Sequence, residues 1–223
     1  ARFWTGDDLD LAETYAWGWA ELASIRRRMA DVALHIQPGA SIPEAIALIS
    51  SDPAYVIEGE EALRSWLQDL LDESVAELNG THFDIPEGIQ RIEAMIAPPG
   101  GAAAMYYTPP SEDLSRPGRT WYPTQGRSRF PLWMEKSICY HEGVPGHHLE
   151  YASAVIQRES MTRMQRTTYN AGFSEGWALY AELLMGELGF LADSAYEMGM
   201  LAVSGFRAAR VVIDIGMHLG WAV

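Results

Sequence analysis

Helical periodicity dominates the N-terminal part of the chain. Apolar side chains recur every three or four positions over 7–36, which predicts a long amphipathic helix. Ser41 and Glu44 have the capping-box spacing that opens a second, short helix. A third periodic stretch, 58–78, ends at an Asn-Gly pair, which is a common helix stop. We therefore expect an N-terminal helical region over 1–80.

The pattern changes over 81–130, where proline and glycine recur and helical periodicity is lost. Within this region, 90–96 and 102–108 are predicted as short β segments, so we expect a small strand-and-loop insertion. Helical periodicity returns over 131–223, and the predicted helices there cover 131–157, 174–188 and 194–223. These three regions are expected to form one continuous domain. The last predicted helix has no stop signal, so we expect the chain to be truncated, a fragment of a longer one.

Composition narrows the function classes. The 223 residues include 16 Lys and Arg against 30 Asp and Glu, a formal charge of −14, which disfavours a nucleic-acid partner. Cys139 is the single cysteine, so no intrachain disulfide can form. No apolar run is long enough for a membrane span, and the first residues do not resemble a signal peptide. We expect a cytoplasmic protein, with an exported form that has lost its leader as the alternative. Nothing in the sequence indicates an oligomeric state.

Three of the 6 histidines lie within one eight-residue stretch, 141–148. Zinc peptidases commonly place two histidines four residues apart on a helix, with a glutamate between them that activates water. Here the position four after His141 is Pro145, and on an ideal helix neither later histidine can share a metal with His141. A two-residue expansion around this proline would bring His147 to the second ligand position. We therefore favour His147, and His148 stays the alternative.

A third protein ligand is expected downstream, within 173–182. Ser174 can cap a helix, which would place Glu175 in the first turn, where the helix dipole favours an ionised carboxylate. Glu182 lies two turns further on the same face. The competing interpretation is that both glutamates are ordinary acidic residues of a helix.

Five stretches together resemble the DUF885 family of bacterial proteins: 106–111, 115–118, 141–149, 175–182 and 207–221. This family is similar in fold and motif to helical zinc carboxypeptidases and thimet-type oligopeptidases. The resemblance implies a mainly α, gluzincin-like metallopeptidase fold with its active site in a deep groove between helices. It also implies Zn²⁺ as cofactor, a peptide as substrate, His141 and His147 as ligands, Glu175 as the third ligand, and Glu142 as general base.

Such a reaction needs a hydrogen-bond donor to the oxyanion. The candidate donors are a histidine and three tyrosines, namely His218, Tyr169, Tyr180 and Tyr107. Asp214 precedes His218 by four residues and could orient its ring, although the pair could also be an ordinary surface pair. For Tyr107, as for Tyr106, we favour a packing role over a catalytic one. His148 and Glu182 are expected to support the ligands from behind.

Three arginines have an ambiguous role. Arg207 and Arg210 could bind a substrate carboxylate, which would favour exopeptidase action, or they could neutralise buried acids. Arg116 has the same ambiguity. The first functional hypothesis is zinc-dependent hydrolysis of peptide bonds in small peptides, by a carboxypeptidase, dipeptidase or oligopeptidase. The alternatives are a catalytically inactive peptidase-like protein that binds peptide or metal, and a helical scaffold whose histidine cluster is structural.

Overall fold

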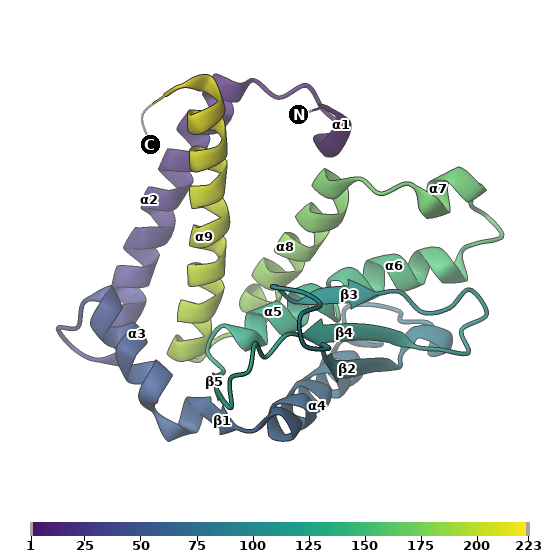
Figure 1. The fold of residues 1–223 in the computed structure, drawn as a ribbon, viewed down its shortest axis with the longest axis horizontal. Helices are drawn as coiled ribbons and strands as arrows, with labels where there is room; N and C mark the ends of the chain where they lie inside the picture. Colours follow the sequence, from purple (N-terminus) through teal and green to yellow (C-terminus); the bar gives the residue numbers. More distant parts are fainter. Residues whose placement is uncertain (1, 222–223) are drawn as a thin grey trace.

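The computed structural model describes residues 2–221, without the side chain of Thr167. It is mainly helical, with two small sheets, as Figure 1 shows. The helices are α1 (Arg2–Thr5), α2 (Leu11–Ile36), α3 (Ile42–Ser51), α4 (Glu60–Leu78), α5 (Glu135–Glu142), α6 (His147–Ile156), α7 (Arg163–Thr167), α8 (Ala171–Glu187) and α9 (Ser194–Leu219). The strands are β1 (Val56–Glu58), β2 (Ile92–Ile96), β3 (Tyr106–Thr108), β4 (Gly118–Tyr122) and β5 (Arg129–Pro131), and short 3₁₀ turns cover Pro53–Tyr55 and Glu87–Ile89.

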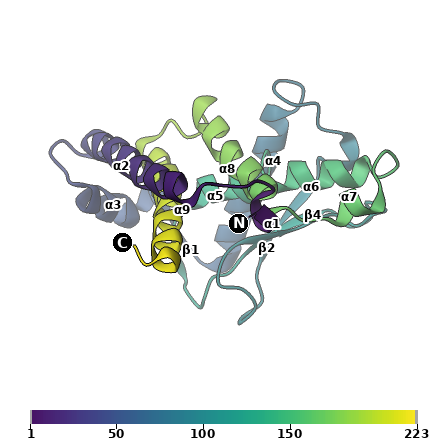
Figure 2. The same ribbon diagram turned by 90° about the horizontal axis from the view of Figure 1, so that it is seen from above.

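The longest helices, α2 and α9, pack side by side in opposite directions and form one side of the molecule with α3 (Figures 1 and 2). The predicted first helix begins later than expected, because the Asp10 side chain accepts hydrogen bonds from Ala12 and Glu13 and caps it. The prediction that α9 lacks a stop signal is wrong. Gly220 follows it in the left-handed conformation, with φ of 69°, as is typical of a helix end. Residues 222 and 223 lie outside the described part of the chain.

The larger sheet lies on the other side of the molecule, whereas the β1–β5 pair contacts both α3 and α4. The order in the larger sheet is β2-β4-β3, with β4 parallel to β2 and antiparallel to β3. This sheet packs against α4, whose apolar face is buried as its periodicity predicts, with Leu63, Leu67 and Leu71 in the core. Strands β2 and β3 lie within the predicted segments but are shorter. Strand β4 and the β1-β5 pair were not predicted.

The prediction of one continuous helix over 131–157 is wrong. The chain there forms two helices, α5 and α6, separated by the four residues 143–146. The prediction that Ser174 caps the next helix is also wrong, because Asn170 accepts a hydrogen bond from the Phe173 amide and α8 begins one turn earlier. Within residues 2–221 no helix is long and apolar enough to cross a membrane.

Candidate metal centre

The break between α5 and α6 brings two histidines together. His141 lies in the last turn of α5 and His147 is the first residue of α6, and their ring centroids are 4.8 Å apart. The Val144-Pro145 peptide bond between them is cis. A Cβ atom on Gly146 would overlap the carbonyl oxygens of Tyr140 and His141, so only glycine lets the chain pass this close to the end of α5. The convergence therefore arises from a break in the helix rather than from an expanded turn.

Helix α8 adds a carboxylate to this pair. Glu175 Oε2 lies 3.4 Å from His141 Nε2, and Glu175 Oε1 lies 3.8 Å from His147 Nε2. One ligand atom from each of the three residues lies within 4.8 Å of the others. Tetrahedral zinc with bonds of roughly 2.0–2.1 Å needs ligand atoms about 3.4 Å apart, so small side-chain movements would close the shell. Because α8 begins at Ala171, Glu175 lies in its second turn, and the expected effect of the helix dipole does not apply.

Charge and burial couple these residues in the absence of metal. Burial by itself lowers the pKa of His141, but contacts with Glu175 and Glu182 outweigh it and raise the pKa to about 9. The interaction with His141 is the main cause that lowers the pKa of Glu175 to about 2. The ligand set therefore contains an ionised carboxylate, which is the form that a metal requires.

Glu182 supports His141 from behind the cluster. This carboxylate is 1% exposed and lies 2.8 Å from His141 Nδ1, which donates to it, so that Nε2 is the nitrogen that would coordinate a metal after losing its proton. Arg207 donates to the same carboxylate oxygen at 2.6 Å, and the Ser137 hydroxyl donates to the other oxygen. Of the two predicted roles for Arg207, the geometry favours neutralising a buried acid.

His147 has a weaker support. Its Nδ1 is buried without a hydrogen-bond partner, and the nearest carboxylate oxygen, from Glu150, lies 3.7 Å away. Glu150 accepts a hydrogen bond from Ser174 at 2.8 Å, so the side chain expected to cap α8 instead holds an acid beside a candidate ligand. Neither Glu150 nor Ser137 was singled out from the sequence. Their spacings of three and four residues from the candidate histidines are the signal that could have found them.

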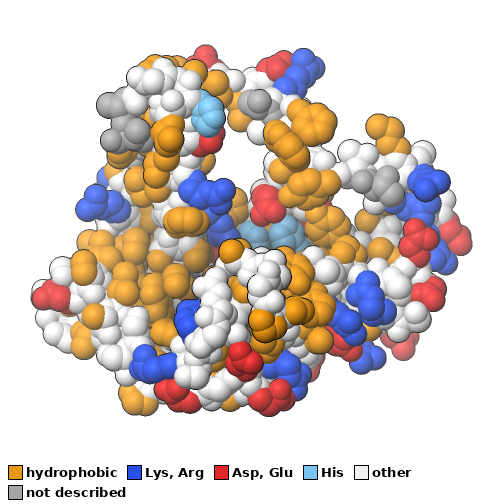
Figure 3. All heavy atoms as spheres, viewed as in Figure 1, with side chains coloured by type: hydrophobic (Ala, Val, Ile, Leu, Met, Phe, Trp, Pro, Cys, Tyr) orange, Lys and Arg blue, Asp and Glu red, His pale blue; other side chains and the backbone are white. Residues whose placement is uncertain are grey.

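Glu142 lies in the same pocket as the three candidate ligands. The pocket has a volume of about 690 Å³ and is lined by the ligand cluster, by Tyr151 and Tyr169, and by α9. Figure 3 shows this hollow, with histidine at its floor and basic side chains on the α9 wall. Glu142 is 7% exposed, and burial raises the pKa of its carboxyl group above the usual value.

His148 points away from this pocket. Its Nε2 lies 2.7 Å from the Ile89 carbonyl oxygen and therefore donates, so its Nδ1 accepts from the Tyr107 hydroxyl at 2.9 Å. Burial lowers the pKa of His148 to about 4, which keeps the ring neutral. A Cβ on Gly118 would lie 2.5 Å from His148 Nδ1, which explains the glycine in that motif. The Tyr107 hydroxyl therefore donates its proton to His148, although the Tyr107 ring lines the pocket. We call the linked contacts of Tyr107, His148 and Ile89 the brace.

Of the other residues predicted to donate to the oxyanion or to bind substrate, some line the pocket and others lie away from it. Tyr169 lines the pocket, and its hydroxyl donates to Glu175 Oε1 at 3.2 Å, while burial raises its pKa to about 12. Tyr180 is 50% exposed and is not part of the pocket wall. Arg116 donates to the carbonyl oxygens of Pro109 and Pro117, and it does not itself line the pocket, although Pro109 does.

The expected position of His218 beside the metal is wrong. His218 lies near the end of α9, its side chain is 76% exposed, and it does not line the pocket. Its Nδ1 lies 2.8 Å from the Asp214 carbonyl oxygen and 3.6 Å from the Asp214 carboxylate. The two residues therefore form a local helix-surface pair, which was the competing interpretation.

Fold and site together define a mainly helical protein with a candidate metal centre at a helix break. The chain belongs to the DUF885 family, described as a bacterial protein of unknown function, and the match covers residues 1–223. No curated protein matches the sequence. Among solved structures, that of the putative lipoprotein from Colwellia psychrerythraea is similar, with a TM-score of 0.85 and 28% sequence identity. The match covers 96% of this chain but 38% of that one, so this chain spans well under half the length of that protein.

Proposed function

We propose that this chain contributes a zinc site that hydrolyses peptide bonds in small peptides. The observation that carries the proposal is the convergence of His141, His147 and Glu175, from three helices, to within 4.8 Å of one another. Two histidines with one glutamate are a common ligand set of catalytic zinc in peptidases, and they leave a coordination position open.

The surrounding residues suit this chemistry. A bound zinc would lower the pKa of a water molecule and polarise the substrate carbonyl. Glu142 is the proposed general base, because it is the buried carboxylate in the same pocket that is not among the three ligands. Its raised pKa suits a group that accepts a proton from water and returns it to the leaving amine.

Two further contacts support the proposal. Glu182 and Arg207 hold the His141 ring in the orientation that presents Nε2 to the cluster. The Tyr169 hydroxyl lies beside Glu175 in the pocket, which makes it the proposed donor to the oxyanion once it turns from that carboxylate. We expect the gluzincin-like arrangement of a helical peptidase on these grounds.

The test is the substitution Glu142→Gln in the zinc-loaded full chain, assayed on a panel of tripeptides and tetrapeptides. We expect about one zinc per chain to be retained and kcat to fall by about 10²–10⁴-fold. Glu187→Gln on the exposed side of α8 is the matched control and should leave kcat unchanged. Full turnover by Glu142→Gln would contradict the mechanism. A wild-type chain that binds zinc but hydrolyses no peptide would instead support the inactive peptidase-like alternative.

A further inference from the structure

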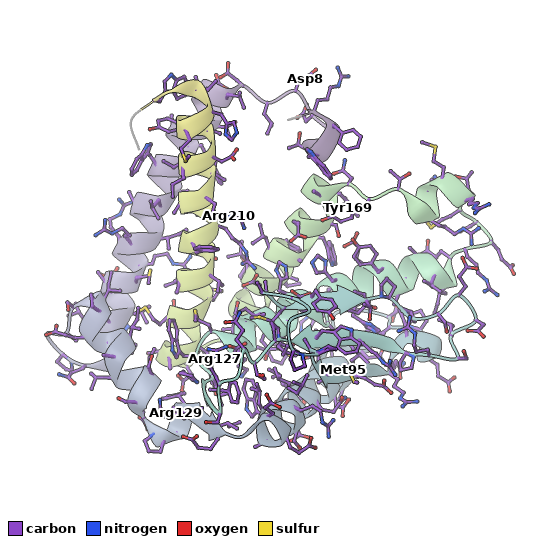
Figure 4. The ribbon with its side chains drawn as sticks, viewed as in Figure 1. Asp8, Met95, Arg127, Arg129, Tyr169 and Arg210 are labelled. Atoms are coloured by element: carbon purple, nitrogen blue, oxygen red, sulfur yellow. The ribbon has the colours of Figure 1, made fainter. Side chains whose placement is uncertain are left out.

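Two arginines on the α9 wall of the pocket, Arg207 and Arg210, are three residues apart and have different surroundings. Arg207 is paired with the buried carboxylate of Glu182. Arg210 is exposed and projects from α9 toward the α8 side of the hollow (Figure 4). Its guanidinium lies 5.8 Å from the centre of the Phe206 ring, and no ion pair of Arg210 is found within residues 2–221.

Several arginines have no ion pair in the described part of the chain, so the lack of one does not by itself single out Arg210. Arg210 differs from the others because it lines the pocket that holds the ligand cluster. The acids that share the pocket, Glu142 and Glu175, lie on α5 and α8 rather than on the α9 wall. The α9 wall of the pocket also carries two apolar side chains, Val203 and Phe206. The pocket therefore has the candidate metal ligands and Glu142 on one side, and on the α9 side it has Arg210, a cation without an ion pair among the described residues.

We propose that Arg210 binds the C-terminal carboxylate of the peptide substrate, which makes this site an exopeptidase that acts from the C-terminus. This inference rests on the proposed function. A planar guanidinium binds a carboxylate with two parallel hydrogen bonds. Asp214, one turn further along α9, is paired with His218 rather than with Arg210. With its carboxylate at Arg210, a small peptide would present a carbonyl near its C-terminus to the cluster, and its last side chains would contact Val203 and Phe206.

A carboxylate could also come from an Asp or Glu side chain of the substrate. The formal charge of −14 repels peptides that carry several acidic side chains. Every unblocked peptide has a C-terminal carboxylate, so the charge balance favours this source. The experiment separates the two sources by the choice of probe.

The experiment measures binding rather than turnover, by calorimetry on the zinc-loaded full chain with Glu142→Gln. The probes are N-acetyl-Phe-Leu as the free acid, the same dipeptide as its C-terminal amide, and N-acetyl-Glu-Leu amide. We expect the free acid to bind about 10–100-fold more tightly than either amide, as a charge-assisted pair would produce. Adding Arg210→Gln should abolish this difference, and Arg210→Lys should restore part of it. Arg27→Gln, on the exposed surface of α2, is the matched control and should change nothing.

Each outcome decides the proposal. Equal affinity for the free acid and its amide, or an unchanged difference after Arg210→Gln, would overturn it. Tighter binding of the Glu-containing amide that also depends on Arg210 would assign the site to acidic side chains and overturn the C-terminal assignment. Repeating the titrations on zinc-free protein separates the two ideas. Dependence on Arg210 in zinc-free protein would support the carboxylate site independently of the metal. A chain that shows this dependence but takes up no zinc would keep the carboxylate site and contradict the proposed hydrolysis.

Discussion

The α5–α6 junction and the last turns of α9 both carry a histidine paired with an acid, yet their surroundings differ completely. At the junction, His141 is 5% exposed and its partners come from α8 and α9, which are distant in the sequence. At the end of α9, the side chain of His218 is 76% exposed and its partner lies one turn away on the same helix. The difference shows that the same pair of residue types can be part of a centre or of a solvated surface, and that burial separates the two cases.

The largest expected difference concerns bound zinc. His147→Ala should remove zinc from the chain entirely, because two protein ligands cannot hold the ion against a chelator. His148→Gln should retain about one zinc per chain, because His148 binds Ile89 and Tyr107 rather than facing the cluster. Metal analysis after dialysis checks both variants, and the reverse result would show that His148 is the ligand.

The stability of the brace formed by Tyr107 and His148 is expected to depend on the size of the side chain at position 118. Gly118→Ala places a methyl group against the Tyr107 hydroxyl and His148 Nδ1, so the brace must open. We expect the free energy of unfolding to fall by about 2–4 kcal/mol, measured by urea denaturation. Gly176→Ala is the matched control, because Gly176 is an exposed position of α8 where a Cβ meets nothing within 4 Å, and it should stabilise the chain by about 0.5–1 kcal/mol. Equal effects would show that the brace contributes no rigidity.

The brace also predicts a dependence on pH. The pKa of His148 is lowered by burial to about 4, whereas an unfolded histidine has a pKa near 6.5. As pH falls below 6.5, the unfolded chain takes up a proton first, so this residue makes the folded state less stable. Between pH 7 and pH 5 we expect a loss of about 2 kcal/mol in metal-free protein, which His148→Gln should remove. Identical pH profiles for the two proteins would contradict the assignment.

The smallest effect on zinc binding, activity and stability is expected for a substitution at the end of α9. His218→Ala should leave zinc content and kcat unchanged, and it should change the free energy of unfolding by less than about 0.5 kcal/mol. The reason is that the His218 ring is exposed and its contacts with Asp214 are local. A large loss of kcat in this variant would show that the end of α9 approaches the pocket during the reaction.

Patterns of neighbouring residues predicted the helices well. They did not predict which segments distant in the sequence pair with each other. The apolar face of α4 and the capping box of α3 depend on residues three or four positions apart, and both are confirmed. Strand β4 pairs with β2 and β3 across loops, and its sequence carries no strong alternation, so it was missed. Asn170 and Ser174 are both good caps, and only the contacts of Ser174 with Glu150 and Tyr151 show which residue begins α8.

In the candidate site, too, features set by neighbouring residues were predicted and features set by long-range packing were not. The spacing of 141–148 correctly predicted that an ordinary helix cannot join the histidines, but it predicted a bulge where the helix ends and restarts. The pairing of Glu182 with Arg207 depends on how α8 packs near α9, which no local pattern contains. The misplacement of His218 has the same origin, because a position along α9 does not define its distance from α5. The roles of these residues in zinc binding and catalysis stay predictions.

The most direct test of the account is anomalous diffraction at the zinc absorption edge, from crystals of the protein grown with zinc. The account predicts one strong peak within bonding distance of His141 Nε2, His147 Nε2 and a Glu175 carboxylate oxygen. Full occupancy at that position would establish the centre on which every functional proposal above depends. A map without a peak among these three side chains, or with zinc bound through His148 instead, would contradict it.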